Sequence, residues 1–243
     1  MDYIIDESNP NKDLNFAINS NLGVDDNMID KLIGKINKIE DEDRVNEFIL
    51  FTSVDTWGEQ AEYIRNGLEF NKFWDNCNKV LEASNRINLT FMSTYNALSV
   101  PNYSKLIEEI YGLKQQYGSE DRYWQSATFL DAYYLRHPNH QTVQVLPQSW
   151  SDEIFKQAQL MDFLGVPLFE SKHIGYSDIE VQKVKRIFDW RIAEWEGKEK
   201  QVNEHRYNFG KFFKEHDKRR GTDFRKIFPE LAEFYNDCLR IKL

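Results

Sequence analysis

The chain has 243 residues, a formal net charge of −9 at pH 7, and 29% charged and 14% aromatic residues. Such an acidic balance argues against a nucleic-acid-binding surface, which is usually basic. No apolar run reaches the roughly 18 residues of a membrane span, and the N-terminus lacks the pattern of a signal peptide. Two cysteines, Cys77 and Cys238, exclude a disulfide scaffold. We expect a cytoplasmic protein that binds neither nucleic acid nor membrane and forms one large domain or a domain with an appendage.

The first regular pattern is at Leu14–Leu22, where apolar and smaller or polar residues alternate. A period of two predicts a strand with one apolar face. Gly23 ends this strand, and Asp25 or Asp26 is placed to cap the following helix. The continuous apolar run Phe48–Phe51 predicts a second strand, covered on both faces.

The same alternation of strands and helices continues to Leu164. It predicts a helix from about Phe70, a third strand at Ile87–Met92, a helix around residues 106–113, a fourth strand at Thr142–Pro147 and a helix around residues 154–161. Repeated alternation implies parallel strands joined by right-handed crossovers. The predicted fold class is therefore α/β, with part of a parallel (β/α) barrel.

Residues 165–243 have a different character, without a further strand signal. Ser177 and Glu180 form a capping box that opens a long helix, and two more helices flank Pro229. We predict a partial barrel over residues 1–164 and a helical C-terminal extension over residues 165–243. Four strands are too few to close a barrel, so the first strand should be an edge that is open to pairing with another chain.

Polar residues follow the buried second strand. Ser53 and Asp55 stand at its carboxyl end, where parallel α/β proteins hold ligands, and Arg65 lies on the next helix. The planar guanidinium of Arg65 is suited to clamp a carboxylate. The structural alternative is that Asp55 caps the helix and Arg65 is a solvated surface residue.

The segment from Ser53 to Asn76 resembles the middle of radical S-adenosylmethionine enzymes, in the branch with SPASM or twitch C-terminal domains. In that branch a Ser-x-Asp turn is followed by an Arg, here Arg65, and then by a Phe and an Asn, here Phe73 and Asn76. Three further segments resemble these proteins, many of them from phages and marine bacteria: residues 18–23, 87–97 and the tail 212–231.

The resemblance implies a site for S-adenosylmethionine. Its expected contacts are Ser53, Asp55, Arg65, Ser93, Asn96 and Leu146. By this resemblance Ser53 and Arg65 contact the methionyl and ribose groups, and Ser93 and Asn96 line the same pocket. Leu146 would touch the adenine, although a leucine on a strand is usually core. Asp55 is either a pocket residue that faces substrate or a helix cap. No catalytic or metal-binding residue is assigned.

The sequence departs from the family in its cysteines. It has neither the Cys-x-x-x-Cys-x-x-Cys loop that binds the [4Fe–4S] cluster nor the auxiliary-cluster cysteines of twitch domains. We expect a split or truncated enzyme, inactive alone, whose cluster comes from a separate N-terminal chain paired at the Leu14–Leu22 edge, with a small-molecule or peptide substrate. The alternatives are a non-catalytic binding or scaffold module derived from such an enzyme, and an unrelated α/β nucleotide enzyme. His137 and His140 lack an evident third metal ligand, which favours a polar turn.

Overall fold

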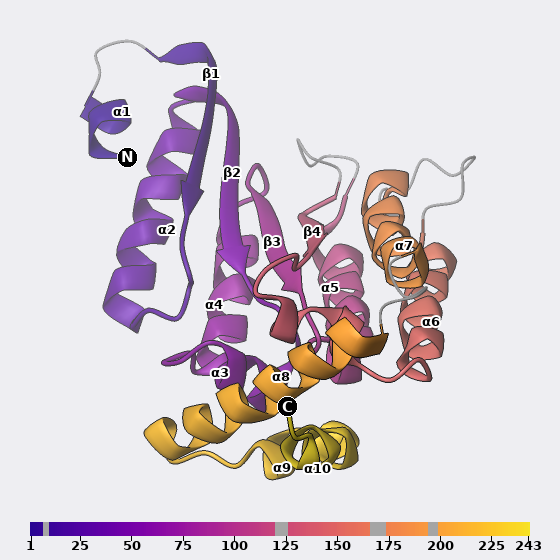
Figure 1. Ribbon diagram of the computed structural model, residues 1–243. Helices are drawn as coiled ribbons and strands as arrows, with labels where there is room; N and C mark the ends of the chain where they lie inside the picture. The colour runs from indigo at the N-terminus through magenta and orange to yellow at the C-terminus, as the bar shows by residue number, and fades with distance from the viewer. Residues whose placement is uncertain (7–9, 120–125, 166–173, 194–198) are drawn as a thin grey trace.

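The computed structural model describes residues 1–6, 10–119, 126–165, 174–193 and 199–243 (Figure 1). Its centre is a parallel sheet in the order β1-β2-β3-β4. The strands are β1 (Asn11–Asn19), β2 (Val45–Ser53), β3 (Asn88–Tyr95) and β4 (Thr128–Tyr134). The α/β class is confirmed. The sheet is open, with β1 and β4 at its edges, so the described strands form no closed barrel.

Helices surround the sheet on one side and at one end. They are α1 (Asp2–Asp6), α2 (Asp26–Asp41), α3 (Gly58–Ile64), α4 (Phe70–Ala83), α5 (Tyr103–Tyr117), α6 (Trp150–Phe163), α7 (Asp178–Ala193), α8 (Glu199–Arg220), α9 (Phe224–Ile227) and α10 (Ala232–Arg240). Successive parallel strands with right-handed crossovers direct their connecting helices to the same side. Accordingly α2, α4 and α5 pack side by side, and Asp25 caps α2 by accepting a hydrogen bond from Met28 N at 2.9 Å.

Only one face of the sheet is covered by these helices. Phe48 and Leu50 of β2 are buried in the core, whereas the alternate residues Ile49 and Phe51 are partly exposed. The open face continues onto β3 at Met92, which is paired with Ser53 and is 39% exposed. The expectation that the run 48–51 is covered on both faces was wrong, because none of the described helices covers the face that carries Ile49 and Phe51.

The fourth strand lies in a different place from the one predicted. Residues 142–147 contain a 3₁₀ turn, Val143–Val145, instead of a strand, and Val143, Val145 and Leu146 are buried. Carbonyl groups of this segment are bound by guanidinium groups and not by a strand ladder: Arg206 Nε donates to Val145 O at 2.7 Å, and Arg191 donates to Leu146 O at 2.9 Å. The short apolar alternation was therefore misleading, and β4 occupies the preceding segment.

Helix α7 covers the outer edge of β4. The predicted capping box is confirmed, since the Ser177 backbone N–H and hydroxyl both donate to Glu180 Oε2, at 2.8 and 2.9 Å. The other oxygen of Glu180 accepts a hydrogen bond from Leu130 N of β4 at 2.7 Å. This contact occupies a backbone donor at the edge of the sheet. The first strand, β1, pairs with β2 alone and remains an edge, as predicted.

The C-terminal helices lie across the carboxyl end of the sheet, with α8 beneath the strand ends (Figure 1). Helix α10 packs against α8 at Gly210, where a Cβ would lie 3.0 Å from the Cys238 carbonyl carbon. The predicted pair of helices around Pro229 is present as α9 and α10. Within the described ranges, no helix combines the length and apolar character needed to cross a membrane.

Candidate functional site

The predicted site residue Ser53 lies at the carboxyl end of β2, on the open face of the sheet. Ser53 is the last residue of β2 and is partly exposed. Its partner in the register is Met92, whose side chain shares the open face. In the described part of the chain, no hydrogen bond engages the Ser53 hydroxyl. This hydroxyl is therefore available to a ligand.

Asp55 links the ends of two strands to Arg65. Its Oδ1 accepts a hydrogen bond from Thr94 N of β3 at 2.8 Å, and its Oδ2 lies 2.9 Å from Arg65 Nε. The Asp55 side chain is 7% exposed and that of Arg65 is 34% exposed. Asp55 does not cap α3, because Trp57 occupies the N-cap position and makes no side-chain cap bond. The alternative that Asp55 caps the helix was therefore wrong, and Arg65 is a partly exposed residue paired with Asp55.

The position of Arg65 follows from how α3 ends. Arg65 is the C-cap residue, and its backbone N–H donates to Ala61 O at 2.9 Å. The guanidinium Nε is buried and makes no well-aligned hydrogen bond. Charge attraction to Asp55 thus orients the side chain while part of the guanidinium stays accessible. Tyr63 of the same helix donates to Asp217 of α8 at 2.9 Å, which anchors α3 to the C-terminal helices.

Three predicted pocket residues lie away from the open face. Ser93 is 2% exposed on the helix-covered face, next to the hydroxyl of Tyr103. Asn96 closes the turn after β3, since its Oδ1 accepts from Leu98 N at 2.9 Å and its Nδ2 donates to Thr94 O at 2.9 Å. Leu146 is fully buried. In this arrangement Ser93 and Leu146 are core residues, Asn96 supports a turn, and ligand contact by any of them stays a prediction.

The two thiols do not suit an iron–sulfur cluster. Cys77 on α4 and Cys238 on α10 are both buried. Burial raises the pKa of Cys77 well above its usual value and that of Cys238 to about 12, whereas metals bind the deprotonated thiolate. Among the residues that the structure describes, no group of three or more potential ligands could hold a metal ion.

A cluster of polar side chains at β4 was not predicted from the sequence, because the fourth strand was assigned to a different segment. Lys183 of α7 forms an ion pair with Asp131 and donates to the Tyr133 hydroxyl at 3.1 Å. Burial acts to lower the pKa of Lys183, but its hydrogen bonds to Asp131 and Tyr133 outweigh this effect and raise it. The alternation within residues 128–134, with Asp131 and Tyr133 on one face, is the signal that could have revealed the group.

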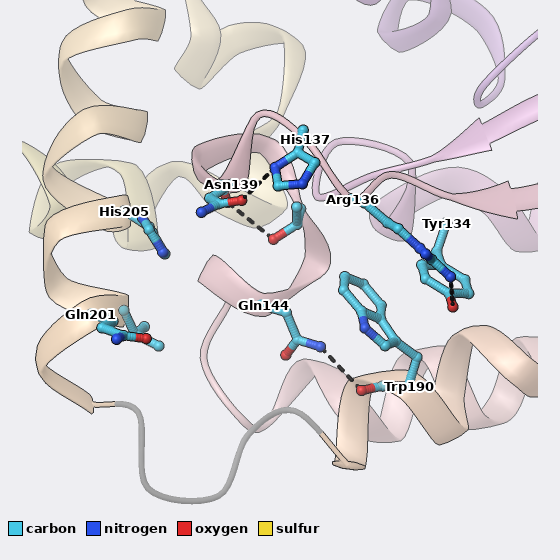
Figure 2. A pocket seen from close by; sticks show the side chains of 10 residues that line it. Tyr134, Arg136, His137, Asn139, Gln144, Trp190, Gln201 and His205 are labelled. Atoms are coloured by element: carbon cyan, nitrogen blue, oxygen red, sulfur yellow. Dashed lines mark hydrogen bonds between the residues drawn. The ribbon is translucent and has the colours of Figure 1, made fainter.

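A cavity of about 580 Å³ lies at the carboxyl end of β4 (Figure 2). Its walls come from the end of β4 and the following turn, from Trp190 of α7 and from the first turns of α8. His137 lines this cavity and has its Nδ1 3.0 Å from Asn139 Oδ1, in a polar turn. The cavity residues are spread over some 70 positions of sequence, and no local pattern connects them.

Comparison of the chain with protein-family models, with curated proteins and with solved structures returned no match. None of these comparisons supports the resemblance at residues 53–76, which stays a prediction.

Proposed function

We propose that this chain is a component of a radical S-adenosylmethionine enzyme. In this proposal it contributes part of the S-adenosylmethionine and substrate pocket, and a separate, cysteine-bearing chain supplies the [4Fe–4S] cluster. The observation that carries the proposal is the Asp55–Arg65 pair, in the segment that follows Ser53 at the carboxyl end of an open parallel sheet. Ligands of parallel α/β proteins bind at this end of the strands.

The chemistry of these residues fits the methionyl group of S-adenosylmethionine. Arg65 carries donors in a planar fork, which matches a carboxylate, and its guanidinium is partly accessible. The Ser53 hydroxyl can donate to or accept from the same ligand. Asp55 orients the guanidinium from a buried position. When bound, S-adenosylmethionine would supply the radical chemistry, and these residues would bind and orient it for a small-molecule or peptide substrate.

The cluster has to come from another chain in this proposal, because the present one has two cysteines, both of them buried, and a [4Fe–4S] cluster is held by cysteine thiolates in larger number. Strand β1 offers a site at which that partner chain could pair. It is an edge of the sheet, and an edge strand presents unpaired backbone groups to another strand. The opposite edge is covered by Glu180 of α7.

Calorimetric titration of the chain with S-adenosylmethionine tests the pocket. We expect binding by the natural chain and about 10-fold or greater weakening by Arg65→Ala, because a charge-assisted hydrogen bond contributes about 1.5–3 kcal/mol. The matched control is Arg240→Ala, which removes an arginine that is 79% exposed and paired with Asp237. Equal weakening by both variants, or no binding by the natural chain, would contradict this assignment.

The alternative is a non-catalytic binding or scaffold module derived from such an enzyme. One experiment distinguishes the enzyme component from the binding module. The chain is co-expressed with the product of a neighbouring reading frame that carries Cys-x-x-x-Cys-x-x-Cys. The enzyme component predicts a stable complex with iron–sulfur absorbance and reductive cleavage of S-adenosylmethionine. A chain that binds the nucleotide but yields neither complex nor absorbance is the binding module.

A further inference from the structure

We infer that the cavity at the carboxyl end of β4 binds a small aromatic anion, with its planar ring against Trp190 and its carboxylate or phosphate at Arg136. The volume of about 580 Å³ is within the range of small-molecule sites. This site lies apart from Arg65 and Ser53, neither of which lines the cavity, and the inference does not depend on the proposed function.

The charge of the lining selects an anion. The chain has 40 acidic residues against 31 basic ones, yet among the residues that the structure describes none that lines the cavity is acidic. The described lining groups that can carry a positive charge are Arg136, His137 and His205. A concave surface whose described lining carries a guanidinium and lacks a carboxylate favours an anionic ligand.

An aromatic wall forms one side of the cavity. The rings of Tyr134 and Trp190 are stacked, with centroids 4.4 Å apart and planes at 16°. Arg136 donates to the Tyr134 hydroxyl at 2.9 Å, so its guanidinium lies at the edge of this wall. Figure 2 shows the wall on one side and Gln201 and His205 of α8 on the other. A planar ring that enters between them can stack on the aromatic wall while its acid group meets Arg136.

Several polar groups of the lining are held in place, and others are left for a ligand. Gln144 is held at both ends: its Nε2 donates to Trp190 O at 3.2 Å, and its Oε1 accepts from Arg191 at 3.2 Å. In contrast, within the described residues no hydrogen bond engages the His205 ring or the Gln201 amide. A lining in which Gln144 is held in place while the polar groups of His205 and Gln201 are left for a ligand is expected of a preformed site.

The cavity and the Asp55–Arg65 pair lie at the same end of the sheet but, in the described part of the chain, share no lining residue. The turn after β3 is joined to the segment that lines the cavity by a hydrogen bond from Ala97 N to Gln141 O at 2.9 Å. A ligand here would therefore lie at the same end of the sheet as S-adenosylmethionine in the proposed function. The two sites are nevertheless separable by mutation, because they share no lining residue among those described.

Titration of the chain alone, without S-adenosylmethionine, tests the inference. The probes are adenosine 5′-monophosphate and indole-3-acetate, which combine a ring with a phosphate or a carboxylate. Adenosine and inorganic phosphate are the matched probes with only one of the two features. We expect at least one combined probe to bind about 10-fold more tightly than adenosine or phosphate; which one does so identifies the acid group.

Two variants locate the bound probe. Arg136→Gln, which alters an exposed side chain, and Trp190→Leu are each expected to weaken binding about 10-fold, with the fold checked by circular dichroism. Arg65→Ala and Arg240→Ala are expected to leave it unchanged. The inference is overturned if the combined probes bind no better than adenosine or phosphate, if Arg136→Gln has no effect, or if Arg65→Ala abolishes binding. The last result would place the probe at the other site.

Discussion

Lys114 and Glu180 form an ion pair that is shielded from solvent, with side-chain exposures of 0% and 1%. Lys114 Nζ also donates to Ser126 Oγ at 3.0 Å and to Thr128 O at 2.6 Å, so its charge is surrounded by acceptors. Burial lowers the pKa of Lys114, and the neighbouring carboxylate of Glu180 opposes this effect. A single residue on α5 thereby connects β4 to the start of α7.

Removing one member of this pair is expected to leave a buried, uncompensated charge. Lys114→Met should therefore reduce the free energy of unfolding by about 3–5 kcal/mol. Lys105→Met, on the same helix, breaks an exposed pair with Glu109 and should cost about 1 kcal/mol or less. Urea unfolding followed by circular dichroism measures both, and equal losses would show that the buried pair contributes no more than the exposed one.

Helix α8 is held on the carboxyl end of the sheet partly by two histidines. The ring of His140 lies 5.0 Å from that of Phe212, and the ring of His216 lies 4.4 Å from that of Tyr63. Burial lowers the pKa of both imidazoles below the usual value of 6.5, and the charges of His205 and Arg220, respectively, add to the effect. Both rings are therefore neutral when α8 is docked at neutral pH.

This element should lose stability on acidification. Because the unfolded chain protonates these histidines near pH 6.5 and the folded chain only at lower pH, the stabilisation is complete above 6.5. It decreases as the pH falls from there towards the folded pKa values. We expect a smaller free energy of unfolding at about pH 5.5 than at about pH 7.5. The double variant His140→Gln, His216→Gln should show a smaller difference, and an unchanged difference would exclude these two groups as the cause.

The two edges of the sheet, β4 and β1, differ in how they are covered. At β4, α7 packs along the edge and Glu180 accepts a backbone hydrogen bond. At the other side β1 is the last strand of the sheet, and in the described part of the chain no helix covers the face that carries Ile49, Phe51 and Met92. An open sheet with one covered edge can be extended at β1 alone, which is where the proposed partner would pair.

Proline at the free edge provides a test of that pairing. Ser20 N donates to Phe51 O of β2, so the alternation along β1 turns the N–H of Ala17 away from β2. Proline is tolerated at an edge position whose N–H faces outward. Ala17→Pro should leave the isolated chain folded and reduce its complex with the cysteine-bearing chain by about 10-fold or more, whereas Ala17→Val should not. Size-exclusion chromatography of the mixed chains reports the complex, and its persistence in Ala17→Pro would argue against pairing at β1.

The sequence by itself determined the class of fold and most of its elements, because apolar periodicity and capping are local properties. The helix from Phe70, the cap at Asp25 and the Ser177–Glu180 capping box are read from residues a few positions apart. The position of Ser53 and Asp55 at the end of a strand follows from the same local signal. The resemblance of residues 53–76 to one family adds an expected function, which stays a prediction.

Only the tertiary structure decided which of two short apolar segments became β4, since that choice depends on which carbonyls Arg191 and Arg206 bind. It also placed Ser93 on the covered face, where the sequence had it beside Ser53, and it paired Asp55 with Arg65. The cavity beside Trp190 joins segments that are distant along the chain. These features depend on contacts between residues that are far apart in the sequence. A local sequence pattern gives no information about the free energies of such contacts.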